Sequence, residues 1–192
     1  LPASIALIIG SNEIVNALFG YGSFTVNDIE QTSLALKYFG YGIPAFAILK
    51  IFANFFFARD NTITPFKISS IIVLINIVIS VLFFKKIGFI IIPIATTLSA
   101  WTGALYFLYL LFKTGYLKIE PEFYTKLTKI IFSTLIMSYI FHNSLNYFAK
   151  NLSYSSDYKI LYLLLIVIFV ALLYFLICYF LKVLNLKSFK TN

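Results

Sequence analysis

Few side chains in this sequence could carry out covalent chemistry, and they do not form a recognisable set. The chain holds one cysteine, Cys178, and one histidine, His142, so a disulfide framework and a multi-histidine metal centre are both excluded. Acidic residues are sparse, and Glu120 and Glu122 flank a proline, where capping the positive end of a helix is the simpler role. Phosphate-binding glycine loops and the common hydrolase motifs are absent. We therefore predict that the protein is not an enzyme and uses no metal and no cofactor.

Other polar side chains stand inside long apolar stretches, where they could serve transport or packing. Lys50 lies deep in one of them, about 12 Å of helix from the polar connection at Arg59. Its ammonium either reaches back to the lipid headgroups or lines a polar pathway. Asn76, Ser80 and Thr96 carry oxygen atoms that could coordinate a small hard cation. Hydrogen bonding between helices is the commoner role of such residues, and we weigh it above an ion site.

A third group of polar side chains recurs at four-residue spacing within one apolar segment: Thr134, Ser138 and His142. This spacing predicts one polar stripe along a helix, which could relay a proton. The alternative is a histidine close to the outer headgroups, because the apolar segment ends about seven residues later.

The composition identifies lipid as the solvent for most of the chain. Of the 192 residues, 61% are hydrophobic and 11% are charged, whereas a soluble domain carries about 25% charged residues. Abundant aromatic residues, 22 Phe and 14 Tyr, argue against disorder. The net charge of +8 does not indicate nucleic-acid binding, because the basic residues stand singly or in pairs between apolar runs. The sequence predicts an integral membrane protein.

Six apolar segments are long enough, or nearly so, to cross a bilayer, which takes about 20 residues of α-helix. They cover residues 1–19, 34–58, 67–84, 88–112, 128–149 and 160–181. We predict an all-α, polytopic transmembrane helix bundle with six spans. Helix starts are predicted at Thr25 with Asp28, which resemble a capping box, at Thr64-Pro65 and at Glu120-Pro121.

The distribution of lysine and arginine sets the expected orientation. Nine basic residues, among them Lys118, Lys187 and Lys190, fall on one side of the six spans, and five fall on the other. The positive-inside rule therefore places both ends of the chain in the cytoplasm. The sequence starts at Leu1 and is apolar at once, so we interpret it as a fragment or the C-terminal part of a longer chain.

Two stretches go beyond generic membrane composition. The first contains Leu1-Pro2-Ala3, Ile14-Val15, Leu18-Phe19, Gly22, Phe24-Thr25 and Asp28. The second contains Ile43-Pro44-Ala45-Phe46, Lys50, Phe56-Phe57-Ala58-Arg59 and residues 62–68. Together they resemble the MurJ (MviN) lipid II flippase family of the MOP flippase superfamily. That family reads roughly Phe-Tyr-Ala-Arg-Gln-Asp-Thr-Arg-Thr-Pro-x-Lys at the second stretch, and this chain departs from it at Phe57, Asp60, Asn61 and Ile63.

The resemblance implies a fold and a function. The family has fourteen transmembrane helices, so these six spans would be the ninth to the fourteenth. Residues 1–112 would be the C-terminal part of the flippase core with four spans, and residues 113–192 two additional spans and a cytoplasmic tail. Such a protein moves the undecaprenyl-linked peptidoglycan precursor, lipid II, from the inner to the outer leaflet of the bacterial cytoplasmic (inner) membrane by alternating access. Its implied partners are lipid II, membrane lipids and the remaining N-terminal helices of the same protein, with no nucleic acid.

Three sets of candidate residues follow from this resemblance. Candidates for the transport pathway are Lys50, Asn54, Asn76, Ser80 and Thr96. The cytoplasmic loop motif, expected to be gating or structural, comprises Arg59, Thr62, Thr64, Pro65 and Lys67. The last two helices would form a groove for the lipid tail, with Thr134, Ser138 and His142 as candidates.

Other functions remain as alternatives. The first is another exporter of the superfamily, either a polysaccharide-repeat flippase or a multidrug exporter, although those branches lack the loop motif. A proton-conducting subunit of a respiratory complex would need charged residues at mid-depth in several helices, and a polyprenyl-phosphate glycosyltransferase would need acidic pairs in a loop.

Overall fold

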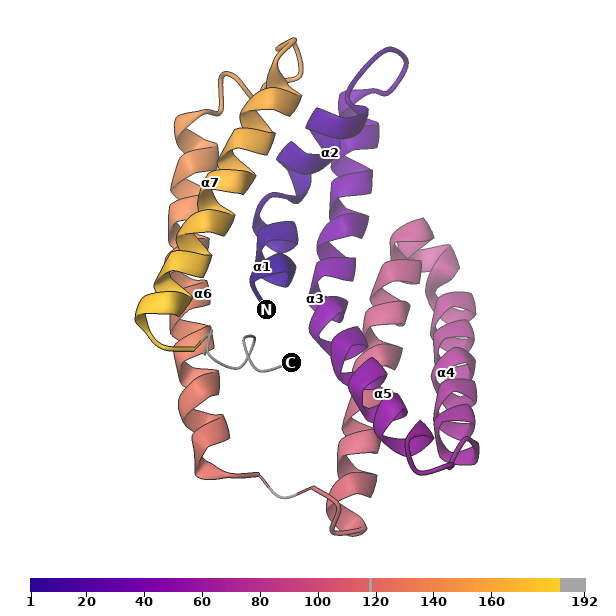
Figure 1. Cartoon of the computed structure of the whole chain (residues 1–192). Helices are drawn as coiled ribbons and strands as arrows, with labels where there is room; N and C mark the ends of the chain where they lie inside the picture. Colours follow the sequence, from indigo (N-terminus) through magenta and orange to yellow (C-terminus); the bar gives the residue numbers. More distant parts are fainter. Residues whose placement is uncertain (118, 184–192) are drawn as a thin grey trace. The chain divides into compact units, whose positions relative to one another are not determined.

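The structure, a computed structural model, describes residues 1–117 and 119–183, and all regular elements within these ranges are helical (Figure 1). They are α1 (Pro2–Ile9), α2 (Ser11–Phe19), α3 (Val26–Phe57), α4 (Ile63–Ile87), the 3₁₀ turn η1 (Gly88–Ile90), α5 (Ile91–Lys113), α6 (Pro121–Tyr147) and α7 (Lys159–Phe180). The predicted all-α fold is confirmed. Lys118, Lys187 and Lys190, which contribute to the predicted orientation, lie outside the described residues.

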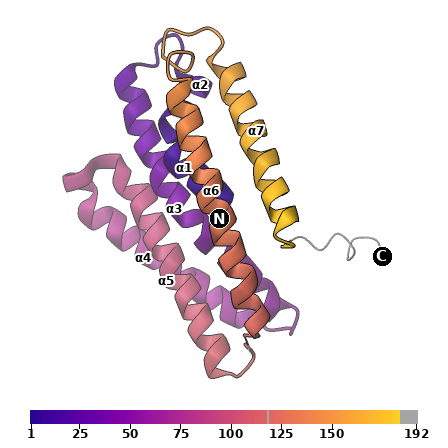
Figure 2. The same cartoon turned by 90° about the vertical axis from the view of Figure 1, so that its left-hand side faces the viewer.

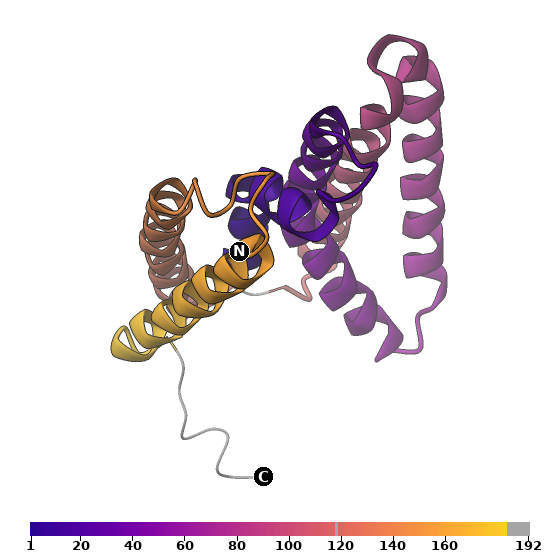
Figure 3. The same cartoon turned by 90° about the horizontal axis from the view of Figure 1, so that it is seen from above.

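Within the part of the chain that the structure describes, three helical stretches are long and apolar enough to cross a membrane: α3, the 51-residue stretch α4–η1–α5, and α7. The bent pair α1–α2 is a fourth if its two halves form one span. Since α4 and α5 have 25 and 23 residues, each has the length of a crossing, and the chain reverses between them (Figures 1 and 3). α6, with charged residues in its first turns, does not meet the same test. The number of six spans therefore stays a prediction.

The first predicted span is broken in the middle. α1 and α2 meet at Gly10 with an angle of 73° between them. A Cβ atom on Gly10 would stand 2.9 Å from two atoms of the Phe141 ring on α6, which is closer than such atoms approach. Glycine at this position thus permits the close approach of the break to α6.

Two of the three predicted helix starts are confirmed. The Thr25 backbone N–H and hydroxyl both donate to Asp28 Oδ2, at 2.9 and 2.7 Å, and the Asp28 N–H donates to Thr25 Oγ1, so α3 begins with a capping box. α6 begins at Pro121, directly after Glu120. The prediction of Thr64 as the residue before the helix and Pro65 as its first residue is wrong, because α4 starts two residues earlier, at Ile63, and Asn61 Oδ1 accepts the Thr64 N–H at 3.0 Å.

The described residues divide into two compact units, the first within residues 1–33 and 119–183 and the second within residues 34–117. In the first unit α1 packs on α6, α2 on α7, and α6 runs beside α7 (Figures 1 and 2). Its apolar core consists of Ala17, Met137, Phe141, Leu145, Leu152, Leu163, Ile166 and Val170. The predicted boundary between residues 112 and 113 separates the core of the flippase family from two additional spans, which is a different criterion from the packing that defines these units. That boundary stays a prediction.

The second unit holds most of α3 together with α4 and α5. Phe56, Ile68, Phe107 and Leu111 form its main apolar core, and Ala45, Ala100 and Ala104 pack closely where α5 meets α3. Two side chains of α5 donate to α3 backbone carbonyls: Thr97 to Tyr38 at 2.8 Å and Trp101 to Tyr41 at 3.0 Å. Small residues and hydrogen bonds of this kind are what hold helices together in lipid.

Large apolar side chains cover the outside of the helices. On α4 and α7 these include Leu74, Val81, Leu82, Leu172, Phe175 and Phe180, all of them mostly exposed. A surface of this kind would associate in water but is satisfied by lipid tails. The exposed side chains therefore support the membrane assignment made from composition.

Candidate functional site

An apolar groove of about 280 Å³ lies in the first unit, between α1, α6 and α7. The residues that line it are Pro2, Ala3 and Ala6 of α1, Met137 and Phe141 of α6, and Val167, Val170, Ala171, Tyr174 and Phe175 of α7. The α1 residues and Ala171 of α7 are small, whereas Met137 and Phe141 of α6 and Tyr174 and Phe175 of α7 are large. With almost no polar atom in its wall, the groove suits a hydrocarbon chain and excludes a charged or sugar group.

The predicted stripe on α6 does not line this groove. Thr134 is buried and its hydroxyl donates to the Ile130 carbonyl at 2.7 Å, Ser138 is half-buried, and His142 is exposed with Nε2 3.1 Å from Asn146 Nδ2. Steps of four residues drift by about 40° around an α-helix, which carries the stripe from the buried side to the exposed side. The role of these three residues as groove candidates stays a prediction.

Met137 and Phe141, which the sequence reasoning missed, are the α6 residues that line the groove. Both are apolar side chains in an apolar helix, so nothing in their type distinguished them. The close approach of Gly10 to Phe141 marks the second of them. That pairing joins residues far apart in sequence and becomes visible only in the fold.

Three of the five pathway candidates meet between α4 and α5 in the second unit. Asn76 Nδ2 donates to Thr96 Oγ1 at 2.9 Å, and the Thr96 hydroxyl donates to the Ile92 carbonyl at 2.8 Å. Ser80 donates to Asn76 Oδ1 at 3.4 Å. Each of these side chains thus has a polar partner inside the cluster, as the hydrogen-bonding alternative expects. In the described residues no group of three or more histidine, cysteine, aspartate or glutamate side chains is placed to hold a metal ion.

Lys50 and Asn54, the other two pathway candidates, lie one turn apart on α3. Both are exposed, and among the described residues neither side chain has a hydrogen-bond or ion-pair partner. They are not joined to the Asn76 cluster by any such contact. Their role in a polar pathway stays a prediction.

The loop motif forms the turn from α3 into α4. The Arg59 guanidinium carbon lies 3.7 Å from the centre of the Phe55 ring and 4.9 Å from that of Tyr116, so the arginine joins the end of α3 to the segment after α5. Asp60 adopts a positive φ of 54° to make the turn. Of the other motif residues, Pro65 is buried, Thr64 is half-buried, and Thr62 and Lys67 are exposed.

A cluster around Lys159 was not predicted at all. Lys159 is the first residue of α7 and its side chain is 0% exposed. Its ammonium donates to the carbonyl oxygens of Gly20 at 2.5 Å and Tyr154 at 3.0 Å and lies 3.5 Å from Asn16 Oδ1. The rings of Tyr21 and Tyr154 have their centres 4.0 and 5.0 Å from Nζ. From the sequence, a lysine at the end of a span is expected at the headgroups, not buried.

Comparison with known proteins identifies the family. The family model "Lipid II flippase MurJ" matches residues 1–163. A probable lipid II flippase MurJ of Rickettsia prowazekii is 31% identical over 192 residues, covering 96% of this chain and 37% of the relative. The lipid II flippase MurJ of Thermosipho africanus is 32% identical over 109 residues, covering 57% of this chain and 23% of the relative.

The fold agrees with a solved structure. Lipid II flippase MurJ in an inward closed conformation superposes with a TM-score of 0.74 at 24% identity, covering 95% of this chain and 36% of that structure. The chain spans between about a quarter and somewhat over a third of the length of the Thermosipho and Rickettsia relatives. On the extent of the family match and the agreement in fold, the chain belongs to the lipid II flippase MurJ family.

Proposed function

We propose that this chain works as part of a lipid II flippase, which moves the undecaprenyl-linked peptidoglycan precursor from the inner to the outer leaflet of the bacterial inner membrane by alternating access. Membership of the MurJ family supports this function. The observation that carries the proposal is the apolar groove between α1, α6 and α7. The polyprenyl tail is the one part of the precursor that matches a wall with so few polar atoms.

We expect the groove to bind the polyprenyl tail weakly and reversibly. Lipid tails are as apolar as the groove, so entering it gains no hydrophobic free energy and the affinity comes from packing alone. The tail therefore stays exchangeable with membrane lipid while the headgroup crosses. This is the behaviour a flippase needs, because a tail held tightly would prevent release in the outer leaflet.

The charged, sugar-bearing headgroup needs a polar route through the protein. Within this chain, the candidates for that route are Lys50, Asn54, Asn76, Ser80 and Thr96. The remaining N-terminal helices of the same protein would supply the residues that bind the headgroup. The turn that contains Arg59 would be gating or structural, and both chain ends would lie in the cytoplasm.

The alternative, another exporter of the MOP superfamily, has less support. The family model and the Rickettsia and Thermosipho relatives all carry the MurJ name. A polysaccharide-repeat flippase or a multidrug exporter would not be expected to match that model over most of this chain.

The test fills the groove with one side chain in the full-length protein. Ala171→Phe places a phenyl ring in the groove, and Leu172→Phe, at the neighbouring position where the side chain is 64% exposed, is the matched control. Each variant is expressed in a bacterium depleted of its own flippase, and the outer-leaflet precursor is measured. We expect Ala171→Phe to lower transport about fivefold, which corresponds to about 1 kcal/mol, and Leu172→Phe to leave it unchanged.

Two outcomes would overturn the proposal. If the unmodified full-length protein is correctly inserted but restores neither growth nor outer-leaflet precursor, it is not a lipid II flippase. If it transports the precursor but Ala171→Phe and Leu172→Phe behave alike, the groove does not guide the tail.

A further inference from the structure

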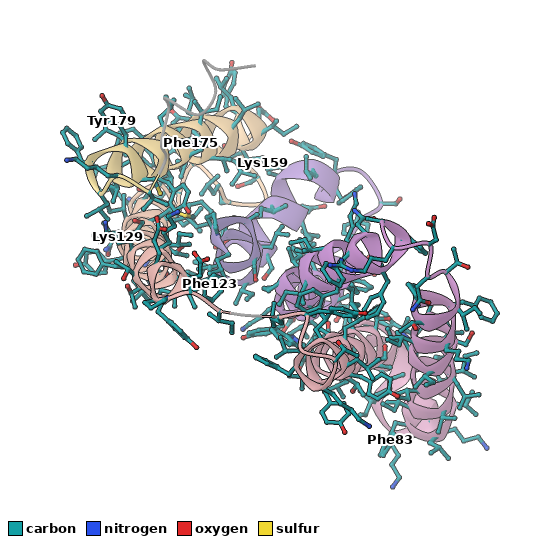
Figure 4. All side chains as sticks on the ribbon, turned by 60° about the horizontal axis from the view of Figure 1, so that its bottom comes forward. Phe83, Phe123, Lys129, Lys159, Phe175 and Tyr179 are labelled. Atoms are coloured by element: carbon teal, nitrogen blue, oxygen red, sulfur yellow. The ribbon has the colours of Figure 1, made fainter. Side chains whose placement is uncertain are left out.

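Lys159 is a buried cation that holds four segments of the first unit together (Figure 4). Its ammonium contacts the end of α2 through Gly20 and Asn16, and the α6–α7 loop through Tyr154. Two further hydrogen bonds run alongside: Asn16 Nδ2 donates to the Leu152 carbonyl at 2.7 Å, and the Tyr154 hydroxyl donates to the Phe24 carbonyl at 3.0 Å. These contacts join α2, the α2–α3 connection, the α6–α7 loop and α7.

The placement of this lysine is not explained by α7 alone. A cation in the first turn of a helix faces the positive end of its dipole and destabilises that helix. The same ammonium stabilises the end of α2, because the Gly20 carbonyl there has no hydrogen-bond partner within the helix. This is also the negative end of the α2 dipole, which attracts a cation. No carboxylate of the described residues forms an ion pair with it. Asp157, two residues earlier, interacts with the ammonium electrostatically without forming an ion pair. The direct partners of the ammonium are carbonyl oxygens, the Asn16 side chain and ring faces, mostly of other segments, and these contacts connect α2 to α7.

The junction of α2 with α7 is connected to the apolar groove in two ways: α7 lines the groove itself, and α2 leads to α1, which also lines it, across Gly10. The groove has α1 on one side and α7 on another. α7 starts at Lys159, and its groove residues begin at Val167, two turns further along the helix; Phe175 and Tyr179 lie towards its opposite end (Figure 4). α1 continues α2 across the 73° bend at Gly10. The packing of α1 and α7 on α6 and the contact of the end of α2 with the start of α7 thus constrain the separation of the two groove walls together.

We propose that Lys159 is a positioning residue for the apolar groove: its ammonium locks the end of α2 to the start of α7 and so sets the width of the groove between α1 and α7. The inference rests on the proposed binding of a polyprenyl tail in that groove. Loss of the ammonium lets α2 separate from α7, and the groove then loses its fit to a polyprenyl chain.

The experiment replaces the lysine and then returns its charge as a separate molecule. Lys159→Ala in the full-length protein removes the side chain beyond Cβ, and n-propylammonium has the atoms that were removed. n-Propanol, of similar size but neutral, is the control compound. Lys150→Ala, at an exposed lysine of the same loop, is the control variant. Groove occupancy is read in proteoliposomes from the photocrosslinking yield of a diazirine-labelled polyprenyl phosphate to the α7 peptide that contains Tyr174 and Phe175. Transport of the precursor is measured on the same samples.

We expect Lys159→Ala to lower the crosslinking yield about fivefold, n-propylammonium to restore at least about half of it, and n-propanol to restore none. Lys150→Ala should behave like the unmodified protein. If Lys159→Ala does not accumulate as folded protein, Tyr21→Ala replaces it, since this change removes the ring 4.0 Å from the ammonium and leaves the lysine in place. Tyr21→Ala should also lower the crosslinking yield, by a smaller factor than Lys159→Ala.

The proposal is overturned if the yield of Lys159→Ala, or of Tyr21→Ala in its place, equals that of Lys150→Ala, or if n-propanol restores Lys159→Ala as well as n-propylammonium does. A change that only weakened the fold would lower the yield without recovery by the ammonium, which also overturns it. Failure of the unmodified protein to transport the precursor would refute the flippase proposal, while the crosslinking yields still decide the role of Lys159.

Discussion

Gly10→Ala tests whether the break between α1 and α2 is held by contact with α6. The added methyl group would stand 2.9 Å from Cε1 and Cζ of Phe141 and 3.2 Å from the Ala6 carbonyl oxygen. The Phe141 ring is 1% exposed and belongs to the core of the first unit, so it has no free space on the core side. The ring must turn into the groove that it lines, or α1 must move away from α6.

The size of the effect follows from two opposed contributions. Overpacking a well-packed site destabilises a protein by about 1–3 kcal/mol. Gly10 has φ −96° and ψ 15°, a backbone conformation that alanine also adopts, so replacing glycine there stabilises the folded chain by up to about 1 kcal/mol. We expect a net loss of about 1–2 kcal/mol in the free energy of unfolding.

A double-mutant cycle separates this contact from general damage. Phe141→Leu removes the ring atoms that the new methyl group would meet and by itself costs about 1 kcal/mol as a large-to-small change in the core. The free energy of unfolding is measured by detergent titration for both single variants and for the pair. We expect the double variant to lose about 1 kcal/mol less unfolding free energy than the two single variants lose in sum. Gly10→Ala with Leu145→Val, one turn further along α6, should be additive.

Additivity of Gly10→Ala and Phe141→Leu would refute the reasoning, because the ring would then not be what resists the methyl group. So would a Gly10→Ala variant as stable as the unmodified protein. In either case the bend would have to arise from the backbone at Gly10 itself and not from its packing.

Two further predictions concern the second unit. Arg59→Lys keeps the charge but loses the flat stacking on Phe55 and Tyr116, so it should lower the free energy of unfolding by about 1 kcal/mol; a thermal shift no larger than that of Lys67→Gln, at an exposed lysine, would contradict this. The Asn76–Thr96 hydrogen bond between α4 and α5 should give a coupling free energy of about 0.6 kcal/mol in a double-mutant cycle of Asn76→Leu and Thr96→Val, measured by the same detergent titration. A coupling of zero would show that the packing of these helices does not depend on this bond.

The sequence was sufficient for features that depend on local chemistry. The low charge and the long apolar segments predicted a helical membrane protein, and the pairing of Thr25 with Asp28 predicted the start of α3, because a capping box needs only residues three apart. The start of α4 was misplaced because Thr64 was taken as the capping residue, whereas Asn61 supplies the capping oxygen. Asn61 holds the Thr64 N–H, so the helix begins before the threonine that was expected to cap it.

Features that depend on distant contacts could not be predicted. Lys159 and Gly20 are 139 residues apart, and neither residue type marks a buried cation. The apolar groove is lined by side chains that would look the same on a lipid-facing helix, such as Met137 and Val170. The polar cluster of Asn76 and Thr96 was found because oxygen-bearing side chains are rare in an apolar segment.

The break at Gly10 has a consequence for how the first unit is made in the cell. α1 and α2 have 8 and 9 residues, about 12–14 Å of helix each, so neither half crosses a bilayer alone. The ammonium that caps α2 belongs to a residue 139 positions later, which at ordinary rates of synthesis leaves the ribosome roughly 7–28 s afterwards. During that interval the α2 terminus is without its capping cation, and α3, α4 and α5 are synthesised first. Assembly of the first unit is thus completed last, when α7 reaches the insertion machinery, and truncation before Lys159 should leave an inserted but protease-sensitive N-terminal segment.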